Sequence, residues 1–324
     1  MSARPGPLNS ICDVAGLAVG HATDDRVESG VTVILPDARC VAAVDVRGGG
    51  PGTRETDALQ SGALVQRIDA LVFSGGSAFG LAAADGAMGW LAARGRGFDT
   101  GAAVVPIVPA AILYDLANGG DKDWGAEPPY RRLGAAACEA AGREPAFGRV
   151  GAGRGARAGA EPGGVGSASL IDPETGFTVA ALAIVNSFGA TRMADGCPYA
   201  WPYEIDDEFG GRRPSGAAEA PAPAFPKLDG PHPARARSNT TLAVVATDAP
   251  LDRAQAGRLA VMAQDGLARA IRPVHTPFDG DSVFALATGR AEGPVDALVQ
   301  ARLGAIGADC VARAIARAVY EAAR

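Results

Sequence analysis

The sequence lacks the features that mark membrane, secreted and metal-binding proteins. No run approaches the roughly 18 consecutive apolar residues of a membrane-spanning helix, and residues 1–9 contain no apolar stretch of signal-peptide length. The five cysteines are scattered without a Cys-x-x-Cys pair, a pattern typical of reduced thiols and not of a disulfide framework or a zinc site. We therefore expect a cytoplasmic protein with no membrane partner and no metal.

Signatures of nucleic-acid and nucleotide binding are also missing. The net charge of -6 argues against nucleic acid as a partner. The glycine-rich turn at 74–80 is not followed by the lysine of a GxxxxGK[ST] phosphate loop, and residues 151–155 lack GxGxxG spacing. Close backbone packing is the favoured interpretation of both loops, with no cofactor. The strand-turn-helix setting of 74–80 leaves a second role open, because its N–H groups could face an anion or a developing oxyanion.

The chain is long enough for one large α/β domain or two ordinary ones, with 324 residues, 48% of them apolar, and 44 glycines. Alternation and β-branched runs predict strands, and longer amphipathic stretches predict helices. The expected strands cover residues 11–21, 30–36, 40–46, 70–73, 167–170, 177–185, 241–247 and 282–288, with 30–36 and 40–46 forming a hairpin or meander. The expected helices cover residues 57–67, 81–94, 127–139, 250–271, 295–303 and 308–323.

The composition changes at residues 206–237, which are rich in proline and paired charges and predict an exposed loop of low order. A Ser-Asn-Thr-Thr cluster follows at 238–241 and opens onto an apolar strand. If the bond between Asn239 and Thr240 were cut, Thr240 would become a nucleophile whose own α-amino group is its base. On this segment alone, the simpler interpretation is that Thr240 and Thr241 merely begin a strand.

Further polar residues stand at strand ends. Asn186 closes the predicted strand 177–185, where it could serve the turn or act as an oxyanion donor. Asp279 and Asp281 precede strand 282–288, and they would lie near Thr240 if the strands that begin at 240 and 282 pair. The loop has no third acidic ligand, so a calcium site is not expected. Tyr114 lies in an apolar stretch and could simply be a core residue.

Several short stretches, in order along the chain, together resemble one family. They are residues 45–49, 74–81, 112–115, 151–153, 185–186, 238–241 and 275–284. The set resembles the self-processing L-aminopeptidase/D-esterase family, which includes β-aminopeptidases and the nylon-oligomer (6-aminohexanoate-oligomer) endo-hydrolase. The threonine and the Asp-Gly-Asp loop are most similar to the nylon-oligomer hydrolase branch.

The resemblance implies a four-layer αββα sandwich that cleaves itself between Asn239 and Thr240. The products would be an α-chain, 1–239, and a β-chain, 240–324, which fold together as one domain and form a homo-tetramer of αβ units. It also implies roles for single residues: Thr240 as the N-terminal nucleophile, Asn186 as the oxyanion-stabilising amide, Asp279 and Asp281 as the orienting acidic pair, and Tyr114 as an active-site tyrosine.

One position departs from the family pattern. Where nylon-oligomer hydrolases and many relatives carry a lysine, this chain has Ala160. Arg154 or Arg157 could supply a positive charge, but a guanidinium group does not shuttle protons near neutral pH. The departure bears on the substrate and the rate, and not on the nucleophile.

The leading hypothesis is an N-terminal-threonine amidohydrolase that cleaves small peptides or linear amide oligomers through an acyl-threonine intermediate. Two alternatives remain open at this point. The first is an acyltransferase similar to ornithine acetyltransferase, which also cleaves itself before a threonine. The second is a non-enzymatic small-ligand binding protein in which Thr240 never becomes a chain terminus.

Overall fold

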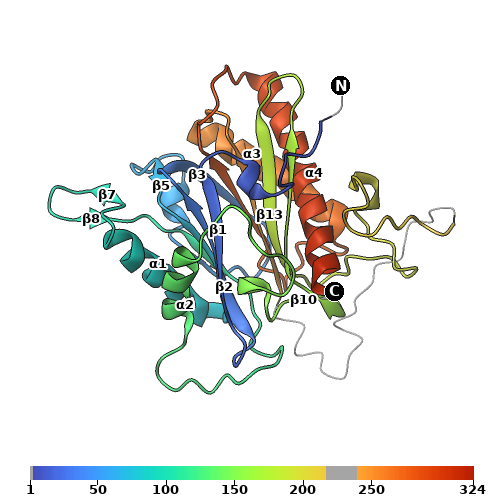
Figure 1. The fold of residues 1–324 in the computed structure, drawn as a ribbon, viewed down its shortest axis with the longest axis horizontal. Coiled ribbons are helices and arrows are strands. Elements are labelled where there is room, and N and C mark those ends of the chain that lie inside the picture. Colours follow the sequence, from blue (N-terminus) through green and yellow to red (C-terminus); the bar gives the residue numbers. More distant parts are fainter. Residues whose placement is uncertain (1–2, 217–238) are drawn as a thin grey trace.

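In the computed structural model, which describes residues 3–216 and 239–324, two β-sheets lie between two pairs of helices (Figure 1). The larger sheet has the strand order β12-β13-β14-β15-β3-β5. Its strands are β12 (Val165–Ile171), β13 (Thr178–Asn186), β14 (Thr240–Thr247), β15 (Ser282–Ala287), β3 (Cys40–Val46) and β5 (Arg67–Ile68). Strand β14 is antiparallel to β13 and parallel to β15, so it is hydrogen-bonded along both edges.

The second sheet has the order β1-β2-β6-β9-β4. Its strands are β1 (Leu17–Asp24), β2 (Ser29–Pro36), β6 (Leu71–Ser74), β9 (Ala110–Ile112) and β4 (Thr53–Arg54). The two sheets share one apolar cluster, which contains Phe73 of β6 and Phe284 of β15 with ring centroids 5.6 Å apart. Alternate residues of β14, such as Leu242 and Val244, belong to this cluster, because successive side chains of a strand point to opposite faces.

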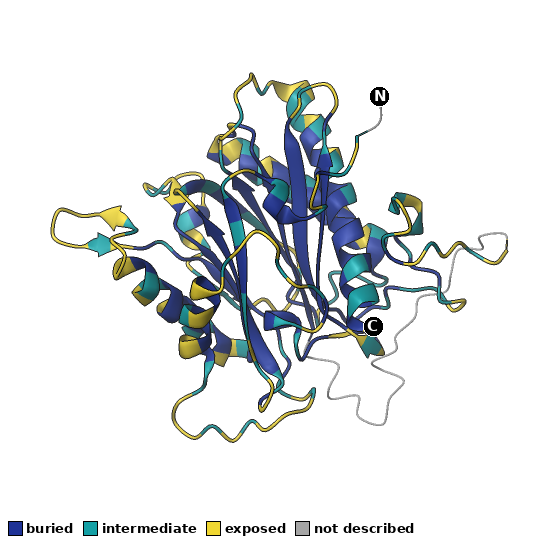
Figure 2. Cartoon of the chain, in the orientation of Figure 1, coloured by how far each residue is buried: buried dark blue, intermediate teal, exposed yellow. Residues whose placement is uncertain are grey.

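A helix pair covers the outer face of each sheet. Helices α3 (Arg253–Ala270) and α4 (Ala297–Ala322) pack on the larger sheet, and α1 (Ala83–Ala92) and α2 (Tyr130–Glu139) pack on the smaller one. Strands covered on both faces must be apolar throughout, and Figure 2 shows the central strands as almost entirely buried.

The remaining elements are short. They are the strands β7 (Phe98–Asp99), β8 (Val104–Val105), β10 (Arg157–Ala158) and β11 (Glu161–Pro162), and the 3-10 turns η1 (Ile11–Asp13), η2 (Asp57–Leu59), η3 (Ser77–Ala82), η4 (Gly151–Gly153) and η5 (Trp201–Tyr203). Residues 11–21 were expected to be one strand, but the capped turn η1 precedes β1 there.

Two neighbouring strands that were expected to form a hairpin belong to different sheets. Strand β2 pairs with β1 and β6, whereas β3 pairs with β15 and β5. The prediction of a hairpin over 30–46 is therefore wrong. Both strands are apolar on the faces that meet between the sheets, and spacing along the chain does not distinguish that arrangement from direct pairing.

Two helix predictions are also wrong. Residues 57–67 form only the turn η2 followed by β5, and the expected helices 295–303 and 308–323 are the single helix α4. Gly304 and Gly307 lie inside α4 and do not end it. A Cβ atom at Gly304 would lie 2.3 Å from the sulfur of Met262, so this glycine permits the close approach of α4 to α3.

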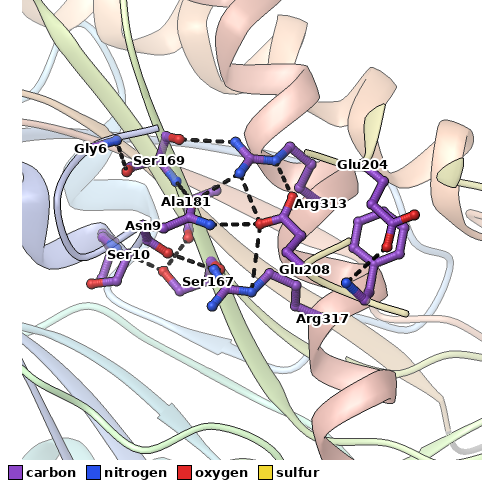
Figure 3. Close-up of polar contacts among 12 residues, drawn as sticks. Gly6, Asn9, Ser10, Ser167, Ser169, Ala181, Glu204, Glu208, Arg313 and Arg317 are labelled. Carbon is purple, nitrogen blue, oxygen red and sulfur yellow. Dashed lines mark hydrogen bonds and ion pairs between the residues drawn. The ribbon is translucent and has the colours of Figure 1, made fainter. Parts of the chain in front are cut away.

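The start of the proline- and charge-rich segment, residues 206–216, contains no helix or strand, and most of its residues are exposed. Phe209 is buried, and the Glu208 carboxylate lies 2.6 Å from the guanidinium of Arg313 on α4. Figure 3 shows that Asn9 and Arg317 belong to the same cluster: the Asn9 side chain bonds to both Glu208 and Arg313, and Arg317 lies beside Glu208. Glu208 thus anchors this stretch to α4, and the rest of the predicted segment, 217–237, lies outside the described residues.

None of the helices in the described part of the chain is long and apolar enough to cross a membrane.

Candidate active site

Thr240 is the first residue of β14, and it lies directly opposite Asn186, the last residue of β13. Opposed residues of antiparallel strands share a face of the sheet. That face is the one on which Leu242 and Val244 meet the second sheet, so Thr240 and Asn186 stand together at the end of the inter-sheet layer. Both residues are buried.

Asn239, the residue before Thr240, is held by hydrogen bonds at both its N–H and its carbonyl oxygen. The Asn239 N–H donates to the carbonyl oxygen of Phe278 at 3.2 Å, and the Gly280 N–H donates to the carbonyl oxygen of Asn239 at 2.9 Å. The hydroxyl of Thr240 also donates to that carbonyl oxygen. The nucleophile candidate and the carbonyl that it would attack are therefore already in contact.

Residue 280 must be small at this point. A Cβ atom on Gly280 would lie 2.7 Å from Oγ1 of Thr240 and 2.9 Å from the carbonyl oxygen of Gly50. Its missing side chain brings a backbone N–H close to the junction, an arrangement that glycine permits best.

Asp279 and Asp281 flank that glycine, and their carboxylates are buried in a set of hydrogen-bond donors. Asp281 accepts from the Thr241 N–H at 2.7 Å and from the His275 N–H at 3.0 Å, and Nδ1 of His275 lies 2.9 Å from the same carboxylate. The strands that begin at 240 and 282 do pair, with Leu242 opposite Ser282 in a parallel ladder, so the condition under which the two carboxylates would lie near Thr240 is met.

Asp279 has its own donors, the Phe188 N–H at 3.0 Å and the Thr276 hydroxyl at 2.6 Å. Its pKa is nevertheless raised to about 6, first by burial and second by the negative charge of Asp281, while these hydrogen bonds work in the opposite direction. The acid pair is therefore electrostatically strained when both carboxylates are ionised.

Asn186 is fixed by contacts with the loop at Tyr114 and with strand β10. Its Nδ2 donates to the carbonyl oxygen of Tyr114 at 3.0 Å, and its Oδ1 accepts from the Arg157 N–H at 2.9 Å. Tyr114 was singled out for its side chain, but the contact it makes with Asn186 uses its backbone. The half-buried Tyr114 therefore lies beside the candidate site, next to Asn186.

The next residue, Asp115, is a buried member of the site region that sequence reasoning missed. Its carboxylate accepts from the Ser29 hydroxyl at 2.6 Å and the Gly76 N–H at 2.7 Å, and burial raises its pKa. A Cβ atom on Gly75 would lie 2.2 Å from the same carboxylate. The glycine-rich turn at 74–80 therefore packs closely, and its position next to Tyr114 was the available signal for Asp115.

A second glycine-rich stretch supports the acidic loop. The Gly50 N–H donates to the carbonyl oxygen of Asp279 at 2.8 Å, and the Gly49 N–H donates to that of Thr276 at 3.3 Å. A Cβ atom on Gly48 would lie 2.3 Å from the Asp281 nitrogen. Backbone packing against the acidic loop accounts for the glycines at 48 and 49, whereas a Cβ atom on Gly50 would meet nothing closer than 3.8 Å.

Ala160 lies at the connection between β10 and β11. The carbonyl oxygen of Ala160 accepts from the Arg157 guanidinium at 3.1 Å, and the Arg154 guanidinium forms an ion pair with Asp25 at 2.8 Å. Both arginines thus have local contacts. Residues 3–216 and 239–324 contain no cluster of three or more His, Cys, Asp or Glu side chains arranged to hold a metal.

The fold and the site together define a class of protein. The mixed α/β architecture matches solved Ntn-hydrolase-like aminopeptidases. A Burkholderia β-aminopeptidase superposes with a TM-score of 0.70 at 24% identity, covering 98% of this chain and 88% of that one. The Ochrobactrum anthropi L-aminopeptidase D-Ala-esterase/amidase, described as a variant of the Ntn-hydrolase fold, gives 0.71 at 22% identity, with 98% and 87% covered.

Sequence comparison gives the family. Residues 9–324 match the model of peptidase family S58, so the chain belongs to that family and is an amide-bond hydrolase. An uncharacterized aminopeptidase of Mycobacterium tuberculosis strain H37Rv is 46% identical over 335 residues, covering 97% of this chain and 94% of its own. The 6-aminohexanoate-oligomer endohydrolase of Kocuria sp. is 30% identical over 293 residues, covering 87% and 76%.

Proposed function

We propose that the protein is a four-layer αββα hydrolase that cuts itself between Asn239 and Thr240 and then uses the new N-terminal Thr240 to hydrolyse amide bonds. The observation that carries the proposal is the contact of the Thr240 hydroxyl with the Asn239 carbonyl oxygen, which also accepts the Gly280 N–H at 2.9 Å. Membership of peptidase family S58 and the two sheets between helix pairs support it.

Self-cleavage begins with attack of Thr240 Oγ1 on the Asn239 carbonyl carbon. The negative charge that develops on the carbonyl oxygen faces the Gly280 N–H, a donor that stabilises an oxyanion without having to reorient. The C–N bond then breaks, the hydroxyl proton ends on the released amine, and an ester joins Asn239 to Thr240. Water hydrolyses the ester to free the Asn239 carboxylate and the Thr240 hydroxyl.

Turnover repeats the same chemistry on a substrate. A free α-amino group has a pKa of about 7.7–8.0, so a useful neutral fraction can take the hydroxyl proton near pH 7. The alkoxide attacks the substrate amide, Asn186 stabilises the oxyanion, and the amine delivers its proton to the leaving nitrogen. Water then releases the acyl group from Thr240. Asp281 fixes the peptide that follows Thr240 through the Thr241 N–H.

The substrate class follows from the relatives and from one departure. Relatives at 46% identity are called uncharacterized aminopeptidases, and those at 29–30% include 6-aminohexanoate-oligomer endohydrolases. In the nylon-oligomer hydrolase pattern that the sequence resembles, a lysine stands at the position of Ala160. We therefore place short peptides with a free amino terminus ahead of linear amide oligomers.

Intact-mass spectrometry tests self-cleavage. The 32.6 kDa wild-type chain should be converted to two fragments, residues 1–239 and 240–324. Thr240→Ala should remain uncut and inactive. Thr240→Ser should still mature because it keeps the hydroxyl. Thr241→Val is the matched control: among the described residues the Thr241 hydroxyl has no hydrogen-bond partner, so its loss should change neither cleavage nor activity. Persistent whole wild-type chain with undiminished activity of Thr240→Ala would refute the proposal.

Supplying an amine acceptor distinguishes hydrolysis from acyl transfer. The hydrolase releases the free acid at a rate that the acceptor leaves almost unchanged. Turnover that depends on the acceptor would instead identify the acyltransferase alternative.

A further inference from the structure

His275 contacts the acidic pair but has no part in the chemistry described so far. Its ring nitrogen Nδ1 lies 2.9 Å from Asp281 Oδ2, and its own backbone N–H donates to the same oxygen at 3.0 Å. The Asp281 side chain is 1% exposed and the His275 side chain 20% exposed. The ring therefore contacts one of the most deeply buried carboxylates of the site.

The backbone at His275, where both contacts to Asp281 originate, is in an uncommon conformation. Its φ is +54°, in the left-handed region that few non-glycine residues adopt. With this φ, the main-chain N–H and the ring of one residue reach the same oxygen of Asp281. Backbone conformations of this kind persist at functional sites where the surroundings hold them in place.

The other oxygen of Asp281 connects His275 to the nucleophile. Oδ1 accepts from the Thr241 N–H at 2.7 Å, and that N–H belongs to the peptide plane that follows Thr240. A rotation of the Asp281 carboxylate would break this hydrogen bond and free the peptide plane to turn. The orientation of the side chain and amino group on the Thr240 Cα would then no longer be fixed. Such shifts matter because a misplacement of about 1 Å costs on the order of 100-fold in rate.

The position of the proton on the His275 ring follows from its hydrogen-bond partner, the Asp281 carboxylate. An ionised carboxylate only accepts hydrogen bonds, so the ring must carry a proton on Nδ1 to bond to it. Asp279 takes its hydroxyl donor from Thr276 instead. The adjacent residues 275 and 276 thus hold one acid each, with different side-chain chemistry.

We propose that His275 is a positioning residue for the Thr240 nucleophile: its Nδ1–H locks the Asp281 carboxylate, which in turn fixes the Thr240–Thr241 peptide. The proposal rests on Thr240 being the nucleophile. It assigns His275 no contact with the substrate, so its loss should lower kcat and leave KM nearly unchanged.

Two variants of His275 distinguish the effect of its hydrogen bond from the effect of its side-chain volume. Asn places an N–H at nearly the same distance from the backbone as Nδ1, whereas Leu fills similar space without a donor. His275→Leu should lower kcat and the rate of self-cleavage about tenfold or more, with KM within about threefold. His275→Asn should restore both rates to within about threefold of wild type. Mass spectrometry follows cleavage, and an amino-acid p-nitroanilide reports turnover.

Wild-type kcat in His275→Leu, or an equal loss in both variants, would overturn the inference. If His275→Leu does not fold, His275→Gln takes its place, because the Gln N–H lies one bond further out and should fail as Leu does. The Thr240→Ala result separates the two proposals. An active Thr240→Ala removes both, whereas an inactive Thr240→Ala beside a fully active His275→Leu removes only the role of His275.

Discussion

Asn186 and Thr240 face each other across β13 and β14, each at the end of its strand and each buried on the same face of the sheet. The pairing places a side-chain amide beside the proposed nucleophile. It depends on a register that joins residues 54 positions apart, and an offset of one residue would turn one of the two side chains to the opposite face.

This relationship predicts the effect of removing the amide. Asn186→Ala should lower kcat of the matured enzyme about 100-fold, the typical cost of losing one oxyanion donor. Asn118→Ala is the matched control, because the Asn118 amide bonds to the carbonyl of Gly155 at 2.8 Å and lies 3.5 Å from Asn186. Its kcat should stay within about threefold of wild type. Similar kcat values for the two variants would count against Asn186.

A single methyl group at Gly280 should slow self-cleavage. Gly280→Ala places a carbon within 2.7 Å of the Thr240 hydroxyl oxygen, so the hydroxyl must move away from the Asn239 carbonyl. We expect at least about a tenfold slower conversion of the whole chain, measured by intact mass over time. Gly50→Ala is the control, since a Cβ there meets nothing closer than 3.8 Å. Equal maturation rates for both variants would contradict the role given to Gly280.

Asp279 should make the protein less stable as pH rises through the acid range. Its folded-state pKa of about 6 lies above the ordinary value of 3.8, so the folded state binds the extra proton between these values. The free energy of unfolding of wild type should therefore fall, relative to Asp279→Asn, as pH rises from about 4 to about 6, and the difference should then be constant. Urea unfolding at several pH values measures it.

Asp172→Asn provides the opposite sign in the same experiment. The pKa of Asp172 is lowered, chiefly by its hydrogen bonds with Arg302, so the stability of wild type relative to this variant rises as pH increases from the lowered pKa to the ordinary value of 3.8 and is constant above it. That gain is lost as pH falls through the lowered pKa. If the two variants moved in the same direction, the electrostatic account of Asp279 would be wrong.

The buried cluster of Figure 3 should contribute strongly to stability. The Arg313 side chain is fully buried, and its guanidinium bonds to Glu208, Asn9 and the carbonyl of Ser169. Arg313→Met leaves the Glu208 carboxylate buried with one arginine fewer, so we expect a loss of about 3–5 kcal/mol in the free energy of unfolding.

An exposed ion pair is the control for this cluster. Arg26 and Asp121 lie 2.7 Å apart, with both side chains 53% exposed, so Arg26→Ala should cost less than about 1 kcal/mol. The midpoints of urea unfolding of Arg313→Met and Arg26→Ala, each compared with wild type, measure the two losses. Losses of equal size would mean that burial does not govern the strength of these pairs.

Local pattern predicted most of the strands and the helices α1, α2 and α3. Residues 178–186, 240–247 and 282–287 are continuous apolar runs of strand length, and the structure has strands there. Pattern failed where packing between distant elements decides the outcome. Gly304 and Gly307 resemble a helix end in the sequence, yet they permit helix contact, and β3 pairs across the molecule with β15 and not with its neighbour β2.

The site residues likewise divide into those that local sequence pattern indicates and those that only contacts between distant segments reveal. Asn186, Asp279 and Asp281 were chosen because they stand at strand ends, and the structure brings all three to the Asn239–Thr240 junction. Asp115 and His275 were missed as functional candidates because their significance lies in what they touch. The sequence shows a buried stretch and a loop at these positions, and only the fold shows which carboxylate or N–H each one meets.

Strand β14 is hydrogen-bonded on one side to β13 and on the other to β15, in the middle of the larger sheet. A cut at its first residue would leave every one of those pairings intact and would change the molecularity of unfolding. The uncut chain unfolds as one molecule, whereas the matured form would separate into two, so its melting temperature would rise with protein concentration. Refolding would then require two chains to meet, and a protein that matures in this way would assemble most readily before it is cut.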